Sequence, residues 1–169
     1  MHKASSIFYL IVLAMSLFVF ACSGEKRKAG LEIAPAFSLT GLDSAAHTLD
    51  EYKAELVMLH FWADWCSHCR QEFTELQAAY DSLSGSGFEI VAINSGQTRD
   101  IVAGIRETYG LTFPMLMDPD TQATELYEVK GLPTTYFIDR DRRVLKRHIG
   151  WLKRSDIYDI FTAINSEAN

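Results

Sequence analysis

The sequence lacks three features that would have indicated other classes of protein. No Lys/Arg stripe extends beyond residues 26–28 and scattered bases between 140 and 147, and 22 acidic residues exceed 16 basic ones for a net charge of −6. A nucleic-acid partner is therefore not indicated. There is no internal repeat or low-complexity segment, and 169 residues are too few for two comfortable domains. A hydrophobic fraction of 48% is typical of one globular domain with a real core.

No apolar run is long enough to span a bilayer as a helix, which needs about 20 residues. The N-terminal run from Ile7 to Ala21 has 15 residues and follows a weakly positive start. That length is typical of a secretory signal. The run ends at Cys22 with the letters VFAC, which resemble the lipobox of bacterial lipoproteins, although Phe20 is bulkier than the residue usual there. In those proteins cleavage precedes the cysteine, which then carries the lipid.

These features predict three segments along the chain. Residues 1–21 are expected to be a lipoprotein-type signal peptide, residues 22–34 a lipidated Cys22 followed by a solvated tether, and residues 35–165 the folded domain. An uncleaved signal anchor is the alternative for the first segment. Either interpretation puts the domain outside the cytoplasm, anchored to a membrane and facing the periplasm.

Apolar patterns predict alternating strands and helices. Leu56–Trp62 is a continuous apolar run, which is typical of a strand buried on both faces. From residue 66 to about 83, apolar side chains recur at spacings of three and four and predict a helix. Further strands are expected at 37–39, 48–49, 88–94, 134–138 and 144–149, and helices at 100–109, at 121–127 and from 155. This order predicts an α/β three-layer domain, with a mixed sheet and helices on both faces.

The motif that carries chemistry is Cys66-Ser67-His68-Cys69, at the junction of the buried strand and the helix. A C-x-x-C in this position is the redox signature of thioredoxin-like domains. Cys66 would face unpaired N–H groups and the positive end of the helix dipole, which favour its thiolate. Cys69, one turn further, could close a disulfide while the helix shields it. One thiol therefore attacks and the other resolves.

Two other interpretations of the cysteine pair are weaker. A zinc site needs four ligands, and the only other thiol is the distant Cys22, while His60 and His68 are awkwardly placed. A purely structural disulfide would close a ring of four residues, which restrains the unfolded chain very little. The redox interpretation requires no metal and no organic cofactor.

Three segments make the chain resemble the TlpA/ResA group of thioredoxin-fold proteins. They are FWADWCSHCRQEF from residue 61, FEIVAIN from residue 88 and GLPTTYFID from residue 131. The resemblance extends over about residues 35–164. It implies a thioredoxin-like fold with an N-terminal hairpin and a β/α element inserted at about 98–117. It also implies a membrane-tethered thiol–disulfide oxidoreductase that acts on client proteins, such as apocytochrome c, and depends on an upstream membrane thiol reductant.

The resemblance also implies roles for single residues. Pro133 matches a cis proline beside the thiols, and a client strand would pair with the backbone at Leu132. Glu72 matches an acidic residue near the thiols, where a half-buried carboxyl would have a raised pKa and could exchange protons with them. The sequence leaves open a trans proline and a solvated helix glutamate instead. Trp65, next to Cys66, is a candidate for client binding or for packing.

His68 departs from the resemblance, because ResA-type proteins carry proline at this position. Stronger oxidants of the DsbA and protein disulfide isomerase kinds have histidine there. An imidazole near the helix N-terminus should stabilise the thiolate of Cys66 and hence the reduced state. We therefore expect a reduction potential above that of thioredoxin by tens of millivolts, where ~30 mV corresponds to ~1.4 kcal/mol. The same departure weakens the argument that the protein is a net reductant.

Two other functions remain as alternatives. A thiol peroxidase of the peroxiredoxin kind has a related fold, but its reactive cysteine follows a Pro-x-x-x-Thr-x-x motif that the residues before Cys66 do not match. A non-catalytic chaperone that delivers metal through paired thiols would need additional Met or His ligands, which this sequence does not arrange convincingly.

Overall fold

A computed structural model of the chain describes residues 32–167, so the predicted signal peptide and Cys22 lie outside the described residues. None of the helices within 32–167 is long and apolar enough to cross a membrane. The elements, in chain order, are β1 (Ser38–Gly41), β2 (Ala46–Thr48), η1 (Leu49–Glu51), β3 (Leu56–Trp62), α2 (Ser67–Leu83), η2 (Ser84–Ser86), β4 (Phe88–Ser95), α3 (Arg99–Tyr109), β5 (Met115–Asp118), α4 (Gln122–Leu126), β6 (Thr134–Asp139), β7 (Val144–Ile149) and α5 (Arg154–Glu167).

The strands form one seven-stranded mixed sheet in the order β2-β1-β5-β4-β3-β6-β7. β3 pairs in parallel with β4, and β4 in parallel with β5, whereas the remaining neighbours are antiparallel. The parallel centre requires helical crossovers, which α2 and α3 supply. The predicted α/β fold with a mixed sheet and an N-terminal hairpin is confirmed.

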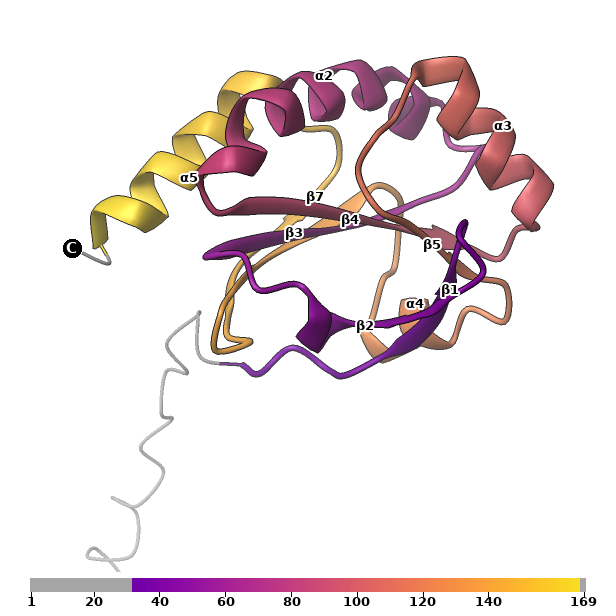
Figure 1. Ribbon diagram of the computed structural model, residues 1–169, viewed down its shortest axis with the longest axis horizontal. Coiled ribbons are helices and arrows are strands. Elements are labelled where there is room, and N and C mark those ends of the chain that lie inside the picture. The colour runs from indigo at the N-terminus through magenta and orange to yellow at the C-terminus, as the bar shows by residue number, and fades with distance from the viewer. Residues whose placement is uncertain (1–31, 168–169) are drawn as a thin grey trace, which may run out of the picture.

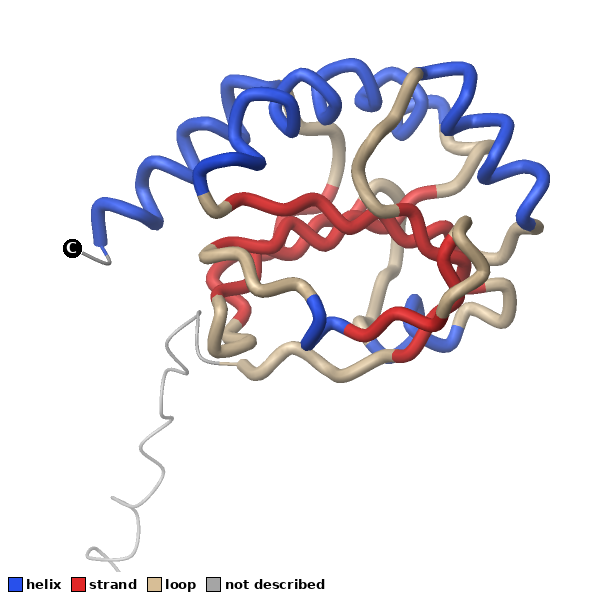
Figure 2. Tube along the Cα trace, in the orientation of Figure 1, coloured by secondary structure: helices blue, strands red, loops and turns tan. Residues whose placement is uncertain are grey.

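The helices divide unequally between the two faces of the sheet. Figure 1 shows α2, α3 and α5 together on one face, and Figure 2 shows the short α4 on the other face with the N-terminal segment. β3 alternates between the two cores, because successive side chains of a strand point to opposite faces. Leu56, Met58 and Trp62 join the core under the three helices, whereas Val57, Leu59 and Phe61 join the second core. The first core also contains both cysteines of the motif.

Two parts of the sheet differ from the pattern-based prediction. β5 was not among the strands predicted from apolar patterns, because Met115-Leu116-Met117-Asp118 is short and has no β-branched residue. It lies between β4 and β1, and with α3 it occupies the region where the inserted β/α element is expected. β1 and β2 lie one or two residues from the predicted positions, because their pairing depends on cross-strand register rather than on apolar content.

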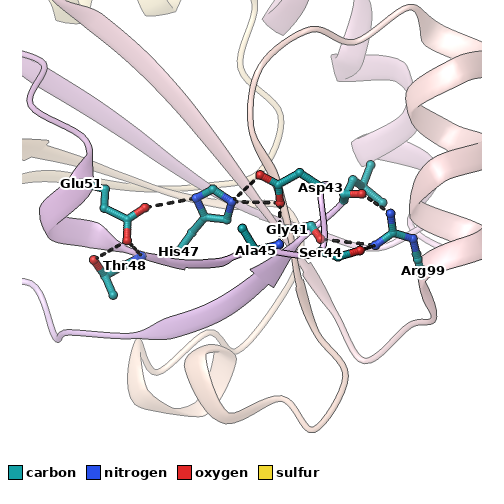
Figure 3. A network of polar contacts seen from close by, with 9 residues as sticks. Gly41, Asp43, Ser44, Ala45, His47, Thr48, Glu51 and Arg99 are labelled. Carbon is teal, nitrogen blue, oxygen red and sulfur yellow. Dashed lines mark hydrogen bonds and ion pairs between the residues drawn. The ribbon is translucent and has the colours of Figure 1, made fainter.

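A polar network holds the N-terminal hairpin at the sheet edge opposite β7, as Figure 3 shows. His47 lies between two carboxylates, with Nε2 3.0 Å from Asp43 and Nδ1 3.2 Å from Glu51. The hydrogen bond with Asp43 raises the pKa of His47. Arg99, at the start of α3, donates to the carbonyl oxygen of Leu42. The hairpin is thus tied to the crossover helix that follows β4.

Candidate active site

Cys66 and Cys69 form a disulfide at the start of α2, with Cα atoms 5.3 Å apart. Cys66 is the N-cap residue of the helix, and its Sγ accepts a hydrogen bond from the backbone N–H of Cys69 at 3.2 Å. Cys66 is 7% exposed and Cys69 is fully buried. Cys66 is therefore the more accessible of the two cysteines.

The turn between β3 and α2 is held by one side chain from α2 and by one from the segment after β4. Arg70 donates to the carbonyl oxygen of Asp64 and forms an ion pair with its carboxylate at 3.7 Å. Gln97, after β4, accepts with Oε1 from the backbone N–H of Asp64 at 2.7 Å and from the Asn94 amide at 2.9 Å. The sequence analysis missed Gln97, which no local pattern distinguishes because its contact with Asp64 spans 33 residues.

The two tryptophans of the motif have different environments. Trp62 is fully buried, and its ring packs edge-on against Phe73 with centroids 4.9 Å apart. It is a core residue. Trp65 is exposed directly before Cys66, where it leaves its indole open to a binding partner.

The chain around Pro133 reaches the same end of β3 as the disulfide. The Leu132–Pro133 peptide bond is cis. Thr134, the first residue of β6, pairs with Phe61 near the end of β3. On the other side, Gly150 donates its N–H to the carbonyl oxygen of Pro133 at 2.8 Å. Pro133 is buried and Leu132 half-buried, so this loop borders the strand end that leads into Cys66.

Glu72 is a buried carboxyl on the same helix as the disulfide. Its Oε1 accepts a hydrogen bond from the backbone N–H of Leu152 at 3.1 Å, whereas Oε2 has no partner among the described residues. Burial raises the pKa of Glu72 to about 8, and the bond from Leu152 offsets part of this effect. The alternative of a solvated glutamate is therefore wrong. A carboxyl with this pKa can both accept and release a proton near neutral pH.

The histidines near the motif lie in contrasting positions. His60 is buried in β3 with Nδ1 2.9 Å from the Thr135 hydroxyl, and burial lowers its pKa to about 3, so the ring is neutral at physiological pH. His68 is exposed in the first turn of α2. Within residues 32–167, no three His, Cys, Asp or Glu side chains gather so that they could hold a metal ion.

Comparisons with known proteins agree with this geometry. The model of the AhpC/TSA family matches residues 31–147. The chain belongs to the AhpC/TSA family. It is 34% identical over 155 residues to the thiol–disulfide oxidoreductase ResA of Bacillus subtilis (strain 168), covering 92% of this chain and 87% of that protein. The ResA of Geobacillus thermodenitrificans (strain NG80-2) is 33% identical over 153 residues, or 89% of this chain and 88% of the relative.

A solved structure shows the same likeness in three dimensions. A crystal structure from Chlorobium tepidum, assigned as a thiol:disulfide interchange protein DsbE, superposes with a TM-score of 0.72 at 31% identity. The match covers 81% of this chain and 96% of that one. This family member is a thiol–disulfide oxidoreductase of the ResA/DsbE type, as the sequence analysis predicted, and its Cys66–Cys69 pair forms a disulfide.

Proposed function

We propose that the protein exchanges its Cys66–Cys69 pair with disulfides of client proteins outside the cytoplasm, and that it acts as a reductant. The observation that carries the proposal is the unequal burial of the two cysteines, since Cys66 is 7% exposed and Cys69 is fully buried. A client disulfide can meet only the first thiol, so the second is reserved for resolution. A structural disulfide would not need this asymmetry.

The reductive cycle follows from this arrangement. The Cys66 thiolate attacks a client disulfide, forms a mixed disulfide and releases one client thiolate. Cys69, once deprotonated, then attacks the Cys66 sulfur, which releases the second client sulfur as a thiolate and leaves the Cys66–Cys69 disulfide. Two electrons pass to the client. Glu72 takes up the proton that Cys69 loses, since its pKa of about 8 lets it change protonation state near neutral pH.

The client and the location are inferred from sequence features. The apolar run before Cys22 supports export and lipidation, which would keep the domain at a membrane that faces the periplasm. The resemblance to the TlpA/ResA group supports apocytochrome c as a client and a membrane thiol reductant as the upstream donor. Trp65 directly precedes Cys66, and the Leu132–Pro133 loop leads into the residue that pairs with Phe61 near the end of β3; these three residues are proposed to receive the client segment.

The proposal is tested by trapping. In full-length Cys69→Ala, the mixed disulfide at Cys66 cannot be resolved, so covalent adducts with client proteins should accumulate in the producing cells. The matched control is Cys66→Ala combined with Cys69→Ala, which should form none. The adducts are separated on non-reducing gels and identified by mass spectrometry. Exported clients with paired cysteines are expected, whereas an absence of adducts, or adducts only with cytoplasmic proteins, would contradict the proposal.

A further inference from the structure

Two cavities adjoin where α3 meets the N-terminal hairpin. The first, the α3 cavity, has a volume of 490 Å³ and is bordered by one face of α3 from Arg99 to Arg106. The second, the hairpin cavity, has a volume of 360 Å³ and lies between the turn at 41–43 and the segment 112–116, which leads into β5. Three residues border both cavities: Leu42, Arg106 and Thr112. None of the residues that line the two cavities belongs to the redox site described above.

The hairpin wall of these cavities is held in place by the polar contacts that Figure 3 shows. Arg99 reaches from α3 and donates to the Leu42 carbonyl oxygen and, at 3.1 Å, to the Ser44 hydroxyl. A Cβ added at Gly41 would lie 2.8 Å from the His47 ring, so the turn is tightly packed. Sites for small molecules are usually pre-formed in this way, with volumes of about 300–1,000 Å³. Both cavities fall in that range.

Arg106 is the cation at the junction of the two cavities. Its Nε donates to the Leu111 carbonyl oxygen at 3.3 Å, and the Leu111 N–H donates to the Arg106 carbonyl oxygen at 2.9 Å. Within residues 32–167, its Nη groups have no hydrogen-bond partner and no carboxylate forms an ion pair with it, whereas Arg140 and Arg142 each have such a pair. A guanidinium with open Nη groups can bind a carboxylate through two parallel hydrogen bonds.

The hairpin cavity adds apolar walls and one polar group without a partner. Phe113 and Pro114 line it together with the rings of Tyr52 and Tyr80. The Tyr80 hydroxyl is engaged with Glu89, whereas the buried Tyr52 hydroxyl has no partner among the described residues. Buried polar groups in folded proteins almost always have a partner, so an unpartnered one marks a place for a water molecule or a ligand atom.

The charges around the cavities restrict the kind of anion that fits. Asp43 borders the hairpin cavity and Glu107 borders the α3 cavity. Arg99 is already bonded to the hairpin, and His47 lies between two carboxylates. Among the described residues that line the cavities, Arg106 is therefore the cation with open donors. A monoanion can pair with it, whereas a dianion would place a second negative charge beside the carboxylates of the rim.

We propose that the joined cavities bind a small organic monocarboxylate with an aromatic or branched apolar body. The carboxylate accepts hydrogen bonds from the Nη groups of Arg106, and the body lies in the hairpin cavity against Phe113 and Pro114. The bound molecule connects α3 with the N-terminal hairpin. Because the site shares no residue with the dithiol site, the proposal does not depend on the redox function.

The test uses phenylacetate as the probe and phenylacetamide as its uncharged counterpart of similar shape. Each compound is titrated into the isotope-labelled, oxidised full-length protein, and its dissociation constant is obtained from backbone amide shifts in NMR spectra. Phenylacetate should bind about ten-fold more tightly than phenylacetamide, because only the carboxylate forms charge-assisted hydrogen bonds with the guanidinium. The largest shifts should occur at the amides of Leu42, Thr112 and Phe113, which border the cavities.

A pair of variants tests the role of the guanidinium. Arg106→Gln should weaken the binding of phenylacetate about ten-fold and leave that of phenylacetamide unchanged. The matched control is Arg154→Gln, because Arg154 is also exposed and has no ion pair among the described residues but lies at the start of α5. This control should alter neither dissociation constant. Signals away from the cavities should be the same in both variants as in the unaltered protein, which checks that the variants are folded.

Three results would overturn the proposal. They are equal affinities of the unaltered protein for the two compounds, an unchanged affinity of Arg106→Gln for phenylacetate, and shifts confined to surfaces other than the cavities. The first comparison needs no variant, so it holds even if Arg106→Gln does not fold. A complete absence of shifts would also contradict the proposal, and water would then be the partner of the Tyr52 hydroxyl.

Discussion

Replacing Glu72 by Gln should change how the stability of the protein depends on pH. The folded protein keeps the Glu72 proton up to a pKa of about 8, because the carboxyl is buried. The unfolded chain releases that proton near the ordinary value of 4.5. Between these values the folded state binds more protons, so the free energy of unfolding must fall as pH rises. The part of the free energy of unfolding that depends on a protonated Glu72 is fully present below pH 4.5 and is lost by about pH 8.

The size of the effect follows from the same two values. The interval from 4.5 to about 8, at 1.36 kcal/mol per pH unit, corresponds to about 5 kcal/mol. This is an upper bound, because the structure can relax and admit water around an ionised carboxylate. Glu72→Gln keeps an oxygen that can accept from the Leu152 N–H but has no proton to lose. The free energy of unfolding of the variant, relative to that of the unaltered protein, should therefore increase by several kcal/mol as pH rises from 4.5 to 8.

The assay is guanidinium unfolding of the oxidised protein at several pH values from 4.5 to 8.5. Glu75→Gln is the matched control, because Glu75 lies one turn further along α2 and also accepts from a backbone N–H, that of Arg154 at 2.9 Å. Unlike Glu72, it is not fully buried. The control should follow the pH dependence of the unaltered protein. If Glu72→Gln does so as well, the reasoning about the buried carboxyl is refuted.

Two further predictions concern the motif and its support. His68→Pro should lower the reduction potential, measured in equilibrium with glutathione, by about 30 mV, because the variant lacks the imidazole that favours the thiolate. An unchanged or higher potential would contradict the role assigned to His68. Gln97→Ala should lower the free energy of unfolding by about 1–3 kcal/mol in urea, since it leaves the buried Asn94 amide and the Asp64 N–H without their acceptor. Gln77→Ala removes three hydrogen bonds, with Asp81 and Thr112, that lie in exposed surroundings, so it should cost less; an equal loss would speak against the assigned role of Gln97.

The elements around the dithiol could be predicted because their signals are local. β3 coincides with the apolar run, and α2 begins one residue after the predicted start because Cys66 caps it. The β6–β7 hairpin was also predicted, across the polar turn at residues 139–142. Periodicity and turn residues report on neighbours within a few positions, so they identify these elements but not what packs against them.

The sequence alone determined the class of chemistry, because a C-x-x-C at a strand–helix junction requires only residues that are adjacent in the chain. Tertiary structure decided how the pair is controlled. Glu72 is buried because the segment at Leu152, 80 residues later, closes over it. The Leu132–Pro133 loop is tied to the same segment, because Gly150 donates its N–H to the Pro133 carbonyl oxygen. Burial and long-range hydrogen bonds depend on the packed chain, and no local pattern of residue types encodes them.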